Sequence, residues 1–291
     1  MLRWRLLLGA LLVATLVGLA VWDHRTSPPG VWVTLPALLL LSVVATQELL
    51  ALFAARDLKP LAWPLYLVNL ALVAVNWLPA WMPMLAKTSP DASLMAAAVL
   101  MLFLGEMRRY ERPGMVMERL ACGVLIVGYI GLLFAFLAKI RLLQGGAAGI
   151  PAMLSLILIV KLGDTGAYTV GRLFGKHKMA PVLSPGKTWE GAVGGLLSAC
   201  FGGWLTGAWL LPLLTSHARV LEPSRWLLYG FVVGLAGMFG DLAESLIKRD
   251  VGRKDSSAWM PGFGGVLDVL DSILFAAPVA YWCWSYGLAG P

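Results

Sequence analysis

The sequence predicts an all-α integral membrane protein, a polytopic helical bundle of about nine transmembrane helices with its N-terminus inside. The 291 residues have a mean hydropathy of +0.78 and only 13% are charged, which excludes an ordinary soluble globular chain. Apolar runs of about 20 residues recur along the whole length, and a bilayer-spanning helix needs this length. The three cysteines stand singly inside apolar runs, so neither a disulfide framework nor a metal-binding spacing is present.

Nine candidate spans follow one another along the chain. The first follows Arg3 and Arg5 and is similar to a signal peptide, but the many later spans favour an uncleaved first helix. The third and fourth are the least regular, because prolines interrupt this region and the fourth is short. The expected spans cover residues 5–22, 31–54, 62–80, 91–105, 119–138, 149–170, 190–213, 225–246 and 266–287.

The distribution of lysine and arginine sets the predicted orientation. With the N-terminus inside, most of these residues fall in cytoplasmic loops, as the positive-inside rule requires. The net charge of +7 is then explained by loops that face anionic lipid, and we expect no nucleic-acid partner. The cations that fall outside are Arg25, Lys87, Lys139, Arg141, Arg219 and Arg225.

The polar residues divide the chain into two regions. Residues 1–145 hold about five spans with few polar residues, and we interpret them as a scaffold. Glu48 is the only carboxylate well inside the first four spans, and we expect it to have a structural role. Residues 146–291 hold about four spans with polar cytoplasmic loops, and we expect this region to be catalytic.

The sixth span carries polar residues at helical spacing. Lys161, Asp164 and Tyr168 stand at i, i+3 and i+7, which places them near one helical face. A carboxylate at membrane depth is costly and usually has a partner or a function. Two interpretations stay open: a Lys161–Asp164 pair that only stabilises the bundle, or a site that lines a cavity.

The loop before the seventh span has the composition of an anion site. Ser184 is placed to cap a helix that begins at Pro185, with Lys187 and Thr188 in its first turn. Free backbone N–H groups, a lysine and a hydroxyl at a helix N-terminus favour a phosphate. An ordinary helix cap is the alternative for Ser184.

Paired carboxylates occur on the last two helices. Asp241, Glu244 and Lys248 share one face of the eighth span, and Asp268 and Asp271 stand at i and i+3 at the start of the ninth. Magnesium commonly takes one or two carboxylates and completes its shell with water and phosphate. We therefore expect Asp241 and Asp268 to bind a divalent metal. The loop between them adds further charges, Arg249, Arg253, Lys254 and Asp255.

Together these residues resemble a known family. Ser245-Leu-Ile-Lys248-Arg249, then Lys254-Asp255, Pro261, Gly264-Gly265, Asp268 and Asp271, is similar to the hallmark of phosphatidate cytidylyltransferases, the CDP-diacylglycerol synthases. The upstream segments Asp164-Thr-Gly-Ala-Tyr168 and Ser184-Pro-Gly-Lys-Thr188-Trp-Glu190-Gly also resemble that family. The resemblance is specific across residues 160–272 and only architectural before them.

The resemblance implies that CTP and phosphatidate react to give CDP-diacylglycerol and pyrophosphate at the inner (cell) membrane, in an active site that faces the cytoplasm. It also implies magnesium, with potassium beside it as a further candidate; a homodimer is a further expectation. We assign Asp241 and Asp268 to the metal with Glu244 and Asp271 in support. Phosphate groups would be held by Lys187, Ser184, Thr188, Lys248, Arg249 and Lys254, and Asp164 and Asp255 complete the expected substrate-binding set.

Two positions depart from the family pattern. Phe263 stands where the family usually has histidine, and Val269 where it usually has arginine. Both changes remove a candidate phosphate contact, so a catalytically divergent relative is one alternative. The others are an enzyme of the CDP-alcohol phosphotransferase type, whose aspartate-rich motif is absent here, and a polytopic transporter, for which no repeated halves are visible.

The predicted orientation can be tested by cysteine labelling. We expect Lys187→Cys and Lys254→Cys to react with a membrane-impermeant reagent only from the cytoplasmic side, and Arg219→Cys only from the other side, because the charge bias places them so. Labelling of Lys187→Cys and Arg219→Cys from the same side would contradict the nine-span topology.

Overall fold

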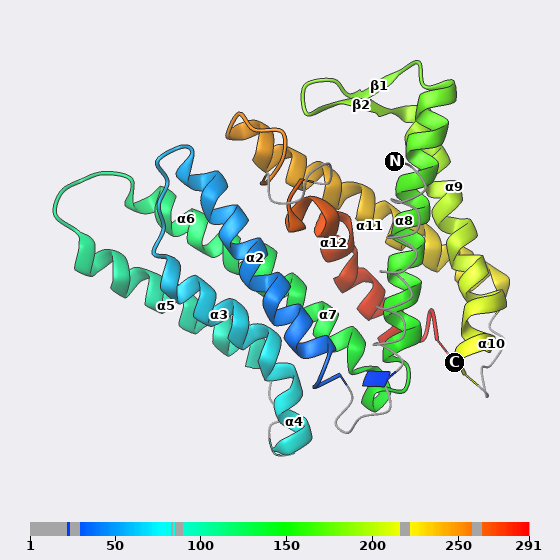
Figure 1. Ribbon diagram of the computed structural model, residues 1–291, viewed down its shortest axis with the longest axis horizontal. Helices are drawn as coiled ribbons and strands as arrows, with labels where there is room; N and C mark the ends of the chain where they lie inside the picture. Colours follow the sequence, from blue (N-terminus) through cyan, green and yellow to red (C-terminus); the bar gives the residue numbers. More distant parts are fainter. Residues whose placement is uncertain are drawn as a thin grey trace.

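The computed structural model describes residues 22–23, 30–82, 84, 90–215, 222–257 and 264–290. Within them the chain is a bundle of helices with one short β-hairpin (Figure 1). The longer helices are α2 (Thr34–Ala54), α3 (Ala62–Ala74), α5 (Pro90–Arg109), α6 (Val116–Ile126), α7 (Leu133–Arg141), α8 (Gly149–Phe174), α9 (Trp189–Leu205), α11 (Pro223–Asp250) and α12 (Val266–Ser285). Short helices α4 (Leu78–Trp81) and α10 (Leu211–Leu214) and the strands β1 (Lys178–Ala180) and β2 (Ser184–Thr188) complete the set.

Seven helical segments among the described residues are long and apolar enough to cross a membrane. They match seven of the nine expected spans, and the third expected span corresponds to a shorter apolar helix at residues 62–77. The first expected span lies outside the described residues, so neither the number nine nor the orientation is decided. The chain is a multi-pass helical membrane protein, and the expected fold class is confirmed at that level.

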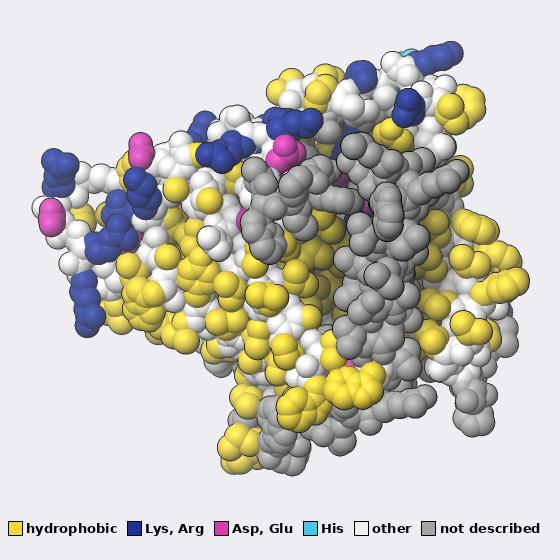
Figure 2. All heavy atoms as spheres, in the orientation of Figure 1, with side chains coloured by type: hydrophobic (Ala, Val, Ile, Leu, Met, Phe, Trp, Pro, Cys, Tyr) yellow, Lys and Arg dark blue, Asp and Glu magenta, His cyan; other side chains and the backbone are white. Residues whose placement is uncertain are grey.

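The surface has the charge pattern of a membrane protein. In Figure 2 lysine and arginine side chains gather along the edge that carries the β-hairpin and the α5–α6 connection. The flank below this edge is mainly hydrophobic. Exposed apolar side chains on this bundle, such as Leu40, Leu100, Phe103 and Leu197, are therefore expected to face lipid.

Helix α12 lies near the centre of the helical bundle (Figure 1). It packs against α11 and α8 on one side and against α7 and α2 on the other. A buried polar contact joins three of these helices, because Tyr229 of α11 contacts Ser155 of α8 (2.8 Å) and accepts a hydrogen bond from Trp284 of α12 (3.1 Å). This contact holds the C-terminal end of α12 against α8 and α11.

Glycines allow α8, α9 and α11 to approach closely. A Cβ at Gly195 would lie 2.9 Å from the Cβ of Ala167, and one at Gly203 would lie 2.1 Å from the carbonyl oxygen of Trp226. Small residues at such crossings are typical of membrane helix pairs.

Substitution of Gly203 tests this packing. Gly203→Ala should lower the melting temperature, because the new methyl group meets backbone atoms of α11 that cannot rotate away, and overpacking of this kind costs about 1–3 kcal/mol. Gly128→Ala is the matched control, since no atom of the described residues outside its own helix lies within 4 Å of its Cβ position. Equal melting temperatures for the two variants in detergent would contradict the close crossing of α9 and α11.

Candidate functional site

A cavity of about 530 Å³ lies among α8, α9, α11, α12 and the β-hairpin. Its volume is within the usual range for small-molecule sites. Acidic and basic side chains from all of these elements except α9 line it, although α8, α11 and α12 are membrane-spanning helices by length and composition. Of the residues predicted from sequence, those at the cavity are Asp164, Ser184, Lys187, Thr188, Asp241, Glu244, Lys248, Asp268 and Asp271.

Three predicted residues lie elsewhere. Arg249 bonds to backbone carbonyls, with Nε 3.3 Å from Leu183 O in the hairpin and Nη1 3.2 Å from Arg253 O. Neither Lys254 nor Asp255 is among the cavity-lining residues. Arg249 therefore links the hairpin to the end of α11, and contacts of these three residues with a substrate stay predictions.

The predicted helix start at Pro185 is wrong. Residues Ser184–Thr188 form strand β2, which pairs antiparallel with β1, and α9 begins only at Trp189. The cap is Thr188, whose Oγ1 accepts a hydrogen bond from the N–H of Gly191 (3.1 Å). The hairpin pairing keeps the backbone extended past the proline, and Lys187 thus reaches the cavity from a strand and not from a helical turn.

Glu190 fixes the base of the hairpin. Its carboxylate accepts hydrogen bonds from the backbone N–H groups of Lys176 (3.1 Å) and His177 (3.3 Å), and His177 Nδ1 lies 2.6 Å away. A backbone bond from Trp189 N to His177 O (2.9 Å) closes the same end. These contacts hold β2, and so Lys187, against the bundle.

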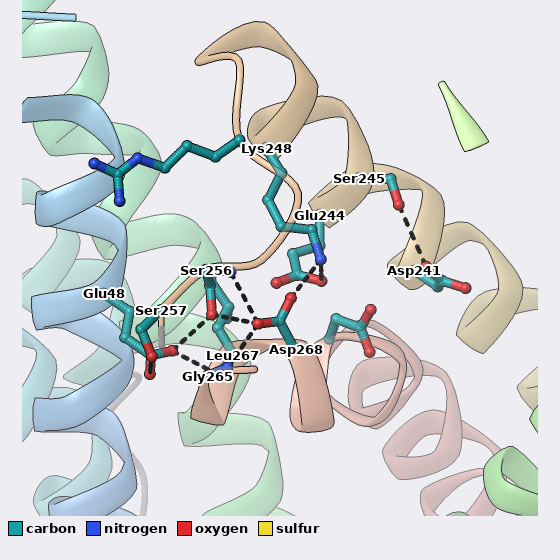
Figure 3. A network of polar contacts seen from close by, with 12 residues as sticks. Glu48, Asp241, Glu244, Ser245, Lys248, Ser256, Ser257, Gly265, Leu267 and Asp268 are labelled. Atoms are coloured by element: carbon teal, nitrogen blue, oxygen red, sulfur yellow. Dashed lines mark hydrogen bonds and ion pairs between the residues drawn. The ribbon is translucent and has the colours of Figure 1, made fainter. Parts of the chain in front are cut away.

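Lysines stand against the carboxylates inside the cavity. Lys187 Nζ forms an ion pair with Asp241 (2.8 Å), although the two residues lie 54 positions apart in the chain. Lys248 Nζ bridges Glu244 (2.7 Å) and Asp268 (2.5 Å) (Figure 3). Glu244 is almost fully buried, and a buried carboxylate requires such a partner.

One carboxylate oxygen of Asp268, Oδ2, accepts hydrogen bonds from the segments before α12. Its Oδ2 accepts hydrogen bonds from the backbone N–H of Gly265 (2.7 Å) and from both N–H and Oγ of Ser256 (2.9 and 2.8 Å) (Figure 3). Gly265 is the N-cap of α12, and Ser256 belongs to the loop that follows α11, so Asp268 joins this loop to the start of α12. Its Oδ1 contacts Lys248.

The two interpretations of Lys161 and Asp164 prove compatible. The side chains form an ion pair (3.3 Å) and both line the cavity. Lys161 Nζ also donates to the carbonyl oxygen of Val269 (3.3 Å), so a cation lies beside the position where this chain lacks the arginine of the family pattern. Phe263, the other departure, lies outside the described residues.

The residues fit a magnesium site that uses few protein ligands. Among the described residues no three His, Cys, Asp or Glu side chains are gathered closely enough to hold one ion as they stand. Five carboxylates nevertheless line the cavity, and among the described residues Glu244 Oε1 is buried without a hydrogen-bond partner. Magnesium bound by one or two carboxylates, with water and phosphate completing its shell, agrees with both observations.

Fold and site together define a multi-pass membrane protein with a charged, phosphate-compatible cavity between its last helices. Residues 3–286 match the model of the Cytidylyltransferase family, and the chain belongs to this family. Two relatives are named phosphatidate cytidylyltransferase: one from Staphylococcus aureus (strain COL), 39% identical over 155 residues, and one from Staphylococcus epidermidis (strain ATCC 12228 / FDA PCI 1200), 41% identical over 155 residues. The match covers 53% of this chain and 54% of each relative, so the chain spans about half the length of the curated relatives it matches.

The buried Lys248 bridge gives a prediction about stability. Lys248→Met should lower the free energy of unfolding by about 3–5 kcal/mol, because it leaves Glu244 and Asp268 without their shared cation. Lys59→Met is the control, since its pair with Asp57 is exposed (66% and 88%) and contributes at most about 1 kcal/mol. Thermal unfolding in detergent measures both, and an unchanged melting temperature for Lys248→Met would refute the bridge.

Proposed function

We propose that this protein is a phosphatidate cytidylyltransferase of the inner membrane, with its cavity open to the cytoplasm. A phosphate oxygen of phosphatidate attacks the α-phosphorus of CTP, the bond from that phosphorus to the β-phosphate oxygen breaks, and CDP-diacylglycerol and pyrophosphate result. The observation that carries the proposal is the cavity in which Lys187, Lys248 and paired carboxylates meet at the level of membrane-spanning helices. Family membership and the names of the relatives support it.

The chemistry requires positioning more than proton transfer. The phosphate of phosphatidate is already ionised, so the nucleophile needs no strong base. The obstacle is bringing two polyanions together and stabilising the charge on the departing pyrophosphate, which fixed cations can do. Lys187 and Lys248 come from different elements and both reach the cavity, so they are placed to hold two different phosphate groups.

Magnesium, bound by Asp241 and Asp268 with Glu244 and Asp271 in support, would offset charge on the triphosphate and on the leaving group. The Thr188 hydroxyl accepts the capping hydrogen bond of α9 and keeps its own O–H to donate to a phosphate, and Ser184 of the same strand also lines the cavity. Potassium and a homodimer stay predictions from the resemblance.

The direct test uses the full chain purified in detergent. Incubated with CTP labelled in the α-phosphate and with phosphatidate, it should transfer label to the lipid fraction in the presence of magnesium and not with EDTA. Folded protein that releases no pyrophosphate and labels no lipid would refute the proposal and favour a catalytically divergent relative. Magnesium-dependent reaction of CDP-diacylglycerol with an alcohol would instead indicate a phosphotransferase.

The two aspartates should act as one unit. Asp241→Asn and Asp268→Asn should each reduce transfer by at least about 100-fold, and the double variant should be no worse than the poorer single variant, because residues that serve one step are non-additive. Asp250→Asn is the control, since its ion pair with Arg56 is exposed at the end of the same helix α11. Losses that multiply in the double variant would show that the aspartates act independently.

A further inference from the structure

A buried carboxylate from the N-terminal half of the chain holds the entry to α12. Glu48 of α2 is 5% exposed and accepts four hydrogen bonds. Two come from the backbone N–H groups of Val266 (2.9 Å, to Oε1) and Leu267 (2.8 Å, to Oε2). The others come from the hydroxyls of Ser257 (2.9 Å, to Oε1) and Ser256 (3.0 Å, to Oε2).

The same contacts extend to the cavity. The hydroxyl of Ser256 lies within hydrogen-bond distance of both Glu48 Oε2 and Asp268 Oδ2. Asp268 in turn contacts Lys248, which contacts Glu244 (Figure 3). A continuous polar chain thus runs from α2 to the carboxylates on α11 and α12.

The packing around Gly265 leaves no room for a side chain. A Cβ at Gly265 would lie 2.0 Å from Ser256 Oγ and 2.5 Å from both oxygens of Glu48. The glycine therefore lets the carboxylate and the serine approach the backbone directly. Because Asp268 Oδ2 is occupied by the N–H groups of Gly265 and Ser256, the direction of its other oxygen depends on where this backbone is held.

We propose that Glu48 is a positioning residue of the active site. It fixes the turn around Gly265 and the first turn of α12, and thereby directs Asp268 Oδ1 toward the cavity, where the proposed function requires a metal ligand. The inference rests on that function for its purpose, but its geometry is independent of the reaction. The N-terminal helices are then more than a scaffold, because one of them sets the orientation of a metal-binding carboxylate.

Glu48→Gln tests the proposal with little change of size. Each oxygen of Glu48 accepts one backbone N–H, so either orientation of the amide places its NH₂ group against the N–H of Val266 or Leu267. Groups that orient a metal ligand typically contribute 10–100-fold in metal affinity. We expect Mn²⁺, used as the probe and followed by electron paramagnetic resonance, to bind the full-length variant at least about 10-fold more weakly. Amide exchange of residues 264–272 should also become faster.

Thr46→Val is the matched control. Thr46 is buried on the same helix, and its hydroxyl donates to Ser42 O (2.7 Å) and accepts a hydrogen bond from Asn69 (2.8 Å). This variant should lose stability while keeping wild-type Mn²⁺ affinity. A purely structural role of Glu48 would make the two variants alike, with lower melting temperatures and unchanged metal binding, and that result would overturn the proposal.

Ser256→Ala provides a second route if Glu48→Gln does not fold. It removes only the hydroxyl shared by Glu48 and Asp268, and it should weaken Mn²⁺ binding in the same direction. Unchanged Mn²⁺ affinity in folded Ser256→Ala or Glu48→Gln protein refutes the positioning role. Metal binding and amide exchange are measured without CTP or lipid. Failure of the transfer assay with wild-type protein would therefore reject the proposed function, whereas the role of Glu48 would still be decided by Mn²⁺ binding.

Discussion

The start of α12 is the constraint on which the site depends. The first turn of a helix leaves N–H groups without partners, and in an apolar surrounding each of them costs several kcal/mol. Here two carboxylates satisfy them, Glu48 from α2 and Asp268 from α12 itself. Because Asp268 also contacts Lys248, the requirement to satisfy a helix end and the requirement to place a charged group in the cavity are met by the same side chain.

Three lysines pair with four of the five carboxylates that line the cavity before any substrate is considered. Lys187 faces Asp241, Lys248 faces both Glu244 and Asp268, and Lys161 faces Asp164. Each pair joins a group that suits phosphate to a group that suits a cation. In the proposed function, a polyphosphate would pair with the lysines and its metal with the carboxylates, so each buried group would exchange one charged partner for another.

The sequence alone predicted most of the membrane-spanning elements and most of the charged residues that line the cavity, because hydropathy and helical spacing act locally. Asp241, Glu244 and Lys248 share a face by their spacing, and Asp268 and Asp271 repeat it. The predicted helix start at Pro185 is wrong because Ser184–Thr188 pair with β1 as a strand. This pairing depends on a second segment of the chain, and Ser184 and Pro185 alone do not indicate it. The contact of Glu48 with Ser256 spans 208 positions, and no local pattern specifies it. The sequence features that bear on this contact are Glu48, a single carboxylate inside an apolar span, and the pair Gly264-Gly265 just before α12.

The long separation between Glu48 and its partners has a consequence for biogenesis. At about 5–20 residues per second of synthesis, α2 precedes the backbone donors of α12, which lie 218 and 219 positions later, by on the order of 10–40 s. During that interval the carboxylate enters the bilayer without the groups that later satisfy it. Glu48 stands six residues before the end of α2 at Ala54, about 9 Å along the helix axis, so its side chain can remain near the headgroups until the last helix arrives. A carboxylate in the middle of α2 would be farther from the headgroups, so the position of Glu48 near one end of the helix lowers the cost of inserting α2 before α12 is made.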